Sequence, residues 1–411
     1  MPLSRTFPSL HYGWVIVATG TLTLFACLGL ARYAYAMLLP GMQSGLGLAY
    51  DRMGFIGTGN FAGYLLSVLL APWLIRRWQP RYVVAGGLLL IGLCMLALSR
   101  CQSFAGAFAL YFCVGMGGGF ANIPLMTVVT RWFRREQRGK AIGLVIGGNG
   151  GAIVFAGLVI PALNRTFGAE GWRLGWLILG IITLVVAVIV ALLLRNDPAE
   201  LGLAPVGKPL PLAPENLVPV EHHGDGRTLL HLGLLYLAFG ATFMVFGTFC
   251  VTTMVKEYGL SDARAGFYWS WVGCCSLFSG VGFGALSDCI GRKYGLALVF
   301  ALQSVAYALF GLHLGEAGLI VAILLYGATV FAIPSIMTAA VADYLGLARA
   351  AGAFATVTLF FALGQTLGPS AAGLIAKATG SFQTAYLLAA LCTVSATLGA
   401  VFLPPPHENR A

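Results

Sequence analysis

Arg32 is the residue with the clearest potential for chemistry, because it stands in an apolar run that begins near Tyr12 and lasts until Pro40. A guanidinium is a planar fork of N–H donors that matches a carboxylate with two parallel hydrogen bonds. Counting by three along a helix places Tyr35 on the face of Arg32, so we expect a phenol beside the guanidinium. This pattern predicts a binding site for an organic anion.

The alternative interpretation is a structural arginine that reaches outward along the helix or pairs with Asp51. An arginine at helix depth in a membrane costs between about 3 and about 17 kcal/mol, depending on the reference state. Such residues normally face a bundle interior or a water-filled cavity. We favour anion binding, because no other formal charge lies well inside an apolar span.

Uncharged polar residues in other apolar spans are candidates to complete the site. Each has an equally simple structural role, since an amide or hydroxyl also joins neighbouring membrane helices by hydrogen bonds. Two of them lie close to Pro124 and Pro334, where the backbone is easier to bend. The candidates are Asn60, Asn122, Asn149, Thr248, Tyr326 and Gln365.

The elements that must position these residues are membrane helices. Of the 411 residues, 59% are hydrophobic and only 9% are charged. A hydrocarbon core about 30 Å thick needs roughly 20 mostly apolar residues per helical span. The chain supplies twelve such stretches, at 12–40, 50–75, 82–99, 103–130, 141–163, 173–194, 229–255, 265–286, 294–313, 317–341, 351–376 and 382–403.

The formal net charge of +10 follows the membrane topology. Basic residues gather in the loops at 76–81, 131–140 and 292–293, which all fall on one side if the spans alternate. Because cytoplasmic loops are enriched in Lys and Arg, we expect both termini to be cytoplasmic and no nucleic-acid partner.

The longest polar stretch, Arg195 to Thr228, divides six spans from six. Its proline content favours a semi-extended linker over a folded module. The "EHHGDG" at residues 221–226 resembles a metal-binding cluster, but adjacent histidines on a loop are more simply solvated polar residues, and we expect neither metal nor cofactor.

The two halves repeat each other at a shift of about 212 residues. "GLAYDRMGF" at 47–55 aligns with "GLSDARAGF" at 259–267, and "PWLIRRWQPR" at 72–81 aligns with "GALSDCIGRK" at 284–293. Parallel repeats of this kind place a substrate site at the membrane midplane between the halves and permit alternating access by rocking.

The second of these segments resembles the signature loop of the major facilitator superfamily, to which the chain is similar over nearly its whole length. The matching residues are Gly284, Asp288, Gly291, Arg292 and Lys293. "RWFRREQRGKAIG" at 131–143 and "HYGWVIVA" at 11–18 resemble the monocarboxylate and oxalate/formate transporter branch, whereas "ARYAYAMLLP" at 31–40 resembles the YbfB-like bacterial group.

The resemblance implies an all-α integral membrane protein with twelve helices in two six-helix bundles. We expect an N-terminal bundle at 1–195, a cytoplasmic linker at 196–228 and a C-terminal bundle at 229–411. It also implies a monomeric secondary transporter of the inner membrane, with a cavity lined by the first span.

The signature loops of the two halves differ, which predicts an asymmetric gate. Asp288 is expected to approach the N-terminus of the fifth span at residues 139–141, and Arg292 to reach Asp343 when the cytoplasmic side closes. In the first half Arg76 replaces the acid, so we expect it to borrow Asp343 from the other half.

No enzymatic motif competes, since the chain has no HExxH, no GxSxG and no nucleotide-binding GxxxxGK[ST]. We therefore expect a secondary transporter of a small organic anion, most simply a monocarboxylate, with Arg32 as the charge anchor and a proton as a candidate coupling ion. The alternatives are an exporter of neutral or amphiphilic compounds and a transporter-like sensor that binds without transport.

Overall fold

The computed structural model describes residues 11–207 and 226–404, and regular structure within them is helical apart from one isolated bridge between Phe133 and Val206. The first helices are α1 (Tyr12–Leu24), the π-helix η1 (Phe25–Tyr33), α2 (Tyr35–Leu46), α3 (Tyr50–Trp78), α4 (Pro80–Leu98), α5 (Phe104–Trp132), α6 (Arg135–Phe167), η2 (Gly168–Glu170) and α7 (Gly171–Leu193). After η3 (Pro198–Leu201) follow α8 (Gly226–Lys256), α9 (Asp262–Ile290), α10 (Arg292–Gly311), α11 (Gly315–Thr329), α12 (Ala332–Leu345), α13 (Leu347–Thr379) and α14 (Gln383–Val401).

Eleven continuous helical stretches in the described residues are long and apolar enough to cross a membrane. One of them, Glu136–Leu193, has 58 residues, which is enough for two passes, and the short η2 divides it into α6 and α7. The predicted twelve-span membrane fold is confirmed. The helices extend beyond the apolar stretches, as in α6, which begins with the polar residues at 135–140 because a helix end outside the hydrocarbon is solvated.

The first pass is not a regular α-helix. It runs through α1, the nine-residue π-helix η1 and α2, and Arg32 lies near the end of the π-helical part. The backbone N–H of Ala34 donates to the carbonyl of Gly29, five residues back, at 3.1 Å. Since π-helical segments cluster at functional sites, this irregularity marks the same place as the charge.

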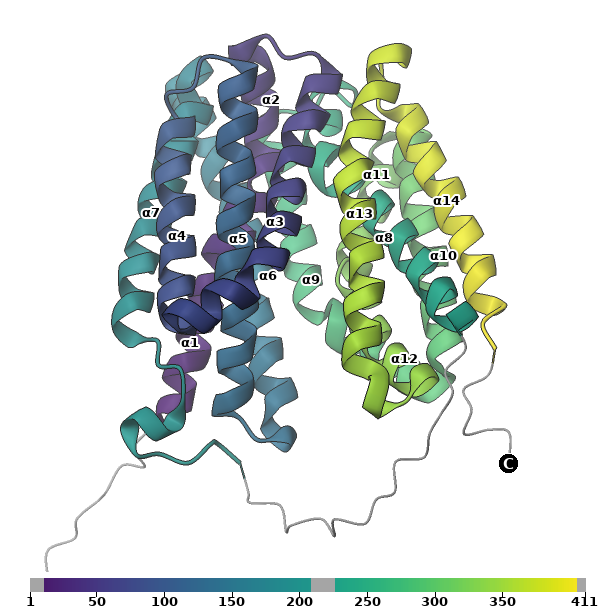
Figure 1. The fold of residues 1–411 in the computed structure, drawn as a ribbon. Helices are drawn as coiled ribbons and strands as arrows, with labels where there is room; N and C mark the ends of the chain where they lie inside the picture. The colour runs from purple at the N-terminus through teal and green to yellow at the C-terminus, as the bar shows by residue number, and fades with distance from the viewer. Residues whose placement is uncertain (1–10, 208–225, 405–411) are drawn as a thin grey trace, which may run out of the picture.

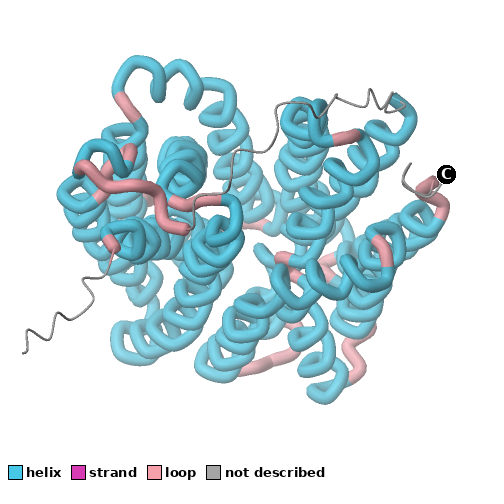
Figure 2. The backbone as a smooth tube through the Cα atoms, turned by 90° about the horizontal axis from the view of Figure 1, so that it is seen from below, coloured by secondary structure: helices cyan, strands magenta, loops and turns pink. Residues whose placement is uncertain are grey.

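Two seams join the first six passes, which we call the first half, to the last six, the second half (Figure 1). In one seam α3 packs on α13, and a side chain at Gly54 would overlap the backbone of Pro369. In the other α6 packs on α9, where Gly157 and Gly266 let the two backbones approach closely. The tube seen from below shows the two groups of helices side by side (Figure 2).

The halves are joined at one end and separate at the other. We call the end with residues 195–207 and the starts of α1 and α8 the linker side, and the opposite end the far side. On the far side Lys377 donates to Asp51 at 2.8 Å and Asn164 donates to Asp262 at 2.8 Å. Toward the linker side a side-chain carbon added at Gly143 of α6 or Gly282 of α9 would meet nothing within 4 Å, and the ribbons diverge there (Figure 1). The halves therefore contact each other on the far side and diverge toward the linker side.

The described part of the predicted linker is not a free tether. Asn196 accepts from the Arg81 backbone N–H at 2.8 Å, and Val206 exchanges two backbone hydrogen bonds of 2.9 Å with Trp132 and Arg134. Residues 195–207 therefore pack on the first half, because their backbone groups find partners there. Most of the "EHHGDG" segment, at 221–225, lies outside the described residues. The bundle boundaries at 195 and 229 stay a prediction.

Candidate substrate-binding site

Arg32 is half-buried and is held by α3. Its Nε donates to Asn60 Oδ1 at 3.3 Å, and its guanidinium carbon lies 4.7 Å from the ring centres of both Phe61 and Tyr64. Within the described residues the two Nη nitrogens donate to no protein group, and neither is closed off from solvent. The outer edge of the guanidinium is thus positioned and still available to a ligand.

The predicted contact between Arg32 and the Tyr35 hydroxyl is wrong. That hydroxyl donates to the Met53 carbonyl at 3.1 Å, and the Tyr35 ring lies 4.6 Å from that of Tyr111. The physical reason is the π-helical turn that carries Arg32, because residues three apart share a face only in a regular α-helix. The alternative in which Arg32 pairs with Asp51 is also wrong, since Lys377 binds that carboxylate.

Asn60 acts as a clamp on Arg32. Its carbonyl oxygen accepts from the guanidinium, and its Nδ2 donates to the Tyr111 carbonyl at 3.2 Å, so the buried amide is fixed in one orientation. Of the sequence candidates, it is the one that contacts Arg32 directly.

Tyr64 is the neighbour that sequence reasoning missed. Its ring covers Arg32 and its hydroxyl accepts from Asn122 Nδ2 at 2.9 Å. The signal was present, because Tyr64 follows Asn60 by four residues and therefore shares its face of α3. Asn122 itself is connected to the guanidinium only through Tyr64, and its Oδ1 is buried without a partner in the described residues.

The second half contributes an aromatic wall. Tyr326 is buried, donates to the Phe243 carbonyl at 3.1 Å and stacks on Phe246 with ring centres 4.1 Å apart. Across the interface from the first half, the Tyr33 ring lies 6.1 Å from the ring of Phe331 of the second half.

No hydrogen bond within the described residues joins Thr248, Asn149 or Gln365 to Arg32. Thr248 is buried against Gly57 on the far-side part of the interface. Asn149 and Gln365 are buried, and the Oδ1 of the first and the Oε1 of the second have no hydrogen-bond partner in the described residues. Buried oxygens of this kind are usually satisfied by water or a ligand. A shared pocket for Arg32, Asn122 and Tyr326 stays a prediction.

One cavity of about 400 Å³ lies between the halves on the far side. Its lining includes Ser44, Trp172 and Lys256 but not Arg32. The cavity is therefore separate from the candidate site.

The gating candidates of the second half form one connected cluster. Arg292 donates to Asp343 at 2.7 Å and to Ser287 at 2.7 Å, and it pairs with Asp288 at 2.5 Å. Gly291, with φ of 90°, makes the turn between α9 and α10 that a side chain would strain. Gly284 lies against Ser335, and Lys293 lies over the Tyr294 ring.

One detail of the predicted gate is wrong. The chain from Asp288 through Arg292 to Asp343 was expected to form on closure, yet it is complete while the halves diverge on the linker side, because all three residues belong to the second half. In this state Arg76 donates to the Pro72 carbonyl of its own helix at 3.2 Å. Its contact with Asp343 and the approach of Asp288 to residues 139–141 stay predictions for the closed state.

Comparisons with known proteins place the chain in a family. The model of the family described as "Uncharacterised MFS-type transporter YbfB" matches residues 24–401. The chain is 23% identical to a hexuronate transporter of Bacillus subtilis (strain 168) over 90% of both chains. It is 22% identical to the human monocarboxylate transporter 2, over 97% of this chain and 88% of that one.

Solved structures share the fold. A bacterial homologue of the human lysosomal transporter Spinster, inward-facing and unoccupied, is similar with a TM-score of 0.73 at 17% identity over 96% of both chains. A mutant of the nucleoside transporter NupG has a TM-score of 0.75 at 11% identity, over 94% of this chain and 99% of that one. The twelve-span fold, the repeated halves and the family match together make this chain a multi-pass membrane transporter of the major facilitator superfamily, in its YbfB-like family and not an enzyme.

Proposed function

We propose that this transporter moves a small organic anion, most simply a monocarboxylate, by alternating access, with Arg32 as the charge anchor. The observation that carries the proposal is the state of the guanidinium: Nε is held by Asn60 while both Nη nitrogens are without a protein partner in the described residues. An Nη pair is the edge that binds a carboxylate with two parallel hydrogen bonds.

The surroundings of Arg32 suit an anion. No carboxylate of the described residues forms an ion pair with it, so its positive charge is not already neutralised. Instead Phe61 and Tyr64 stabilise the cation through their ring faces, an interaction that leaves the Nη edge open. The aromatic wall around Tyr326 would contact the organic part of the substrate.

The relatives support this substrate class. The two described above are named for transport of hexuronate and of monocarboxylates, which both carry a carboxylate. Because their sequence identity to this chain is only 23% and 22%, these relatives do not identify which acid the chain transports.

Orientation follows from charge. If the linker side, where most basic loops lie, is cytoplasmic, both termini are cytoplasmic in the inner membrane and this structure is the inward-open state of a monomer. A proton is the candidate coupling ion for this transport. The alternatives to it are export of neutral compounds and a sensor that binds without transport.

Uptake into proteoliposomes tests the proposal. Labelled monocarboxylates and a hexuronate, each with its uncharged amide, are offered to the purified protein with and without a pH gradient. Accumulation of an acid but not its amide supports anion transport, and dependence on the gradient supports proton coupling. Binding without accumulation would indicate a sensor, and movement of the amides alone would indicate a carrier of neutral compounds.

A further inference from the structure

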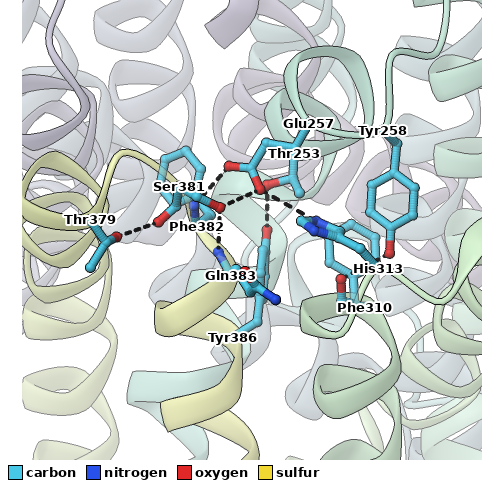
Figure 3. A network of polar contacts seen from close by, with 10 residues as sticks. All are labelled: Thr253, Glu257, Tyr258, Phe310, His313, Thr379, Ser381, Phe382, Gln383 and Tyr386. Carbon is cyan, nitrogen blue, oxygen red and sulfur yellow. Dashed lines mark hydrogen bonds and ion pairs between the residues drawn. The ribbon is translucent and has the colours of Figure 1, made fainter.

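The carboxylate of Glu257, on the far side of the second half, contacts the segment before α14 and the turn between α10 and α11 (Figure 3). Glu257 directly follows α8, and its Oε1 accepts from the Phe382 backbone N–H at 2.7 Å while its Oε2 accepts from Ser381 Oγ at 2.8 Å. Phe382 is the N-cap residue of α14. A helix N-terminus carries a partial positive charge, which attracts a carboxylate placed there.

His313, in the turn between α10 and α11, faces the same carboxylate. Its Nε2 lies 3.4 Å from Glu257 Oε2, is shielded from solvent and makes no regular hydrogen bond in the described residues. The side chain as a whole is 29% exposed, so protons from the far side can reach the ring. Its φ of 50° is a conformation that side chains other than glycine rarely adopt, and such strain is commonest at functional sites.

Three tyrosine side chains lie around the pair. The His313 ring lies 4.6 Å from Tyr258, whose pKa burial raises to about 12, so that phenol stays neutral. Tyr50 of α3 and Tyr386 of α14 are further phenols within range of Glu257.

The charged side chains near this pair are either exposed or bound to other partners. Lys256 is exposed beside Glu257 in the chain, and Lys377 is paired with Asp51. Glu316, three residues beyond His313, is bound by Arg264 and Tyr268.

The segment that Glu257 holds also closes the far side. The Phe382 ring lies 5.0 Å from Tyr50 of the first half and 4.3 Å from Phe249 of α8. Lys377, at the end of the preceding helix α13, makes the ion pair with Asp51 across the same seam. Glu257 therefore connects the end of α8 and the turn at His313 to the residues that meet the first half.

From this arrangement we propose that Glu257 and His313 form a proton-binding site whose occupancy favours the closed far side. A proton from the far-side solution binds His313 Nε2, and the resulting imidazolium donates to Glu257 Oε2 as an ion pair. The pair then draws α8, the α10–α11 turn and the start of α14 together beneath Tyr50. Loss of the proton returns the neutral imidazole and weakens this connection.

The sign follows from linkage. If the proton binds more tightly in the closed state, acid on the far side shifts the population toward that state, which is open on the linker side. The inference rests on alternating access but not on the identity of the substrate, so it is tested without substrate.

Spin labels on the far side measure the closure directly. Cysteines replace the exposed residues Gln102 of the first half and Ala378 of the second, in a chain with the exposed Cys274 and Cys289 changed to Ser. Distances between the labels are measured by pulsed electron paramagnetic resonance between about pH 8 and about pH 5.5, the range over which histidine titrates. The short-distance population of the otherwise unchanged chain should rise several-fold on acidification.

Four variants give the proposal its controls. His313→Asn and Glu257→Gln should lose the pH response, whereas Glu316→Gln, which removes a carboxylate at the same end, should keep it. His313→Arg carries a fixed charge and should stay closed at both pH values, which separates loss of the proton site from misfolding. A parent chain without a pH response, or a His313→Asn chain that responds like the parent, would overturn the proposal. Anion binding at Arg32 would be untouched by either result.

Discussion

The middle of the first pass and the middle of the seventh occupy corresponding places in the two halves but differ in every respect that matters for binding. The first is π-helical and carries Arg32, whereas α8 is a regular helix whose inner face carries Phe239, Phe243 and Phe246. Ring centres along α8 lie 5.0 Å apart between Phe239 and Phe243, so the aromatic side chains form a continuous surface. In the proposed site, one half supplies a charge and the other an apolar wall.

Under the proposed function, this difference gives the transporter its selectivity. A symmetric site would present two charges or two apolar walls, and neither suits the small organic acid that we propose as substrate. The Arg32 guanidinium is held from one side by Asn60 and remains open on the other.

Replacing Arg32 should have the largest effect on transport. Arg32→Gln removes a charged pair of hydrogen bonds, each worth about 1.5 to 3 kcal/mol, so uptake of the acid should fall by well over tenfold. In Arg32→Lys the uptake of the acid should fall by about tenfold, because the charge remains but the bidentate geometry is lost. Initial uptake rates in proteoliposomes measure both.

Arg52 provides the matched control. It also lies over an aromatic ring, that of Phe104 at 5.5 Å, but on the far side. Arg52→Lys should transport at nearly the unchanged rate, and an equal loss in Arg52→Lys and Arg32→Lys would contradict a special role for Arg32.

A carboxylate introduced beside Arg32 should compete with the substrate. Asn60→Asp places a negative charge at the atom that now accepts from Nε at 3.3 Å, so the guanidinium gains an internal partner. Acid affinity should fall by about tenfold, which is about 1.4 kcal/mol, while protein stability is maintained. Equilibrium binding and thermal unfolding measure the two effects, and unchanged affinity in Asn60→Asp would count against the site.

The linker-side turns give a smaller contrast between the halves. Arg292 holds two carboxylates with its side chain 17% exposed. Arg76 is exposed, and within the described residues its hydrogen bond is to its own helix. Asp343→Asn should lower the stability of the second half by about 1 kcal/mol, and Arg76→Gln by almost nothing. Thermal unfolding in detergent checks the difference; equal shifts would remove the asymmetry.

The smallest effect is expected on the aromatic wall. Tyr326→Phe keeps the stacking on Phe246 and loses one hydrogen bond to the Phe243 carbonyl. The cost is about 1 kcal/mol of stability, with a change of only a few-fold in the Michaelis constant for the acid. If the hydroxyl instead binds substrate directly, the Michaelis constant will rise more than tenfold.

Sequence reasoning reached the fold because hydropathy and loop charge are summed over long segments. The repeat and the signature loop at 284–293 then identified the superfamily, and the ion pair of Arg292 with Asp343 was predicted correctly. Side-chain neighbours were harder. Tyr35 was assigned to Arg32 because a π-helix leaves no clear pattern in the sequence, and Tyr64 was missed because tyrosine is common in membrane helices for packing alone.

Contacts between segments that are distant in the sequence were harder still to predict. Glu257 is one acid near a span end, and nothing in the sequence indicates that it binds the start of α14 or faces His313. Such pairs depend on how separate helices are placed in space.

Calorimetric titration of one carboxylic acid and its uncharged amide, against the unchanged protein and Arg32→Gln, tests the central claim most directly. We predict that the unchanged protein binds the acid at least tenfold more tightly than the amide, and that Arg32→Gln loses this preference while its affinity for the amide stays the same. The same acid-to-amide ratio in both proteins would contradict the role of Arg32 as the anion anchor.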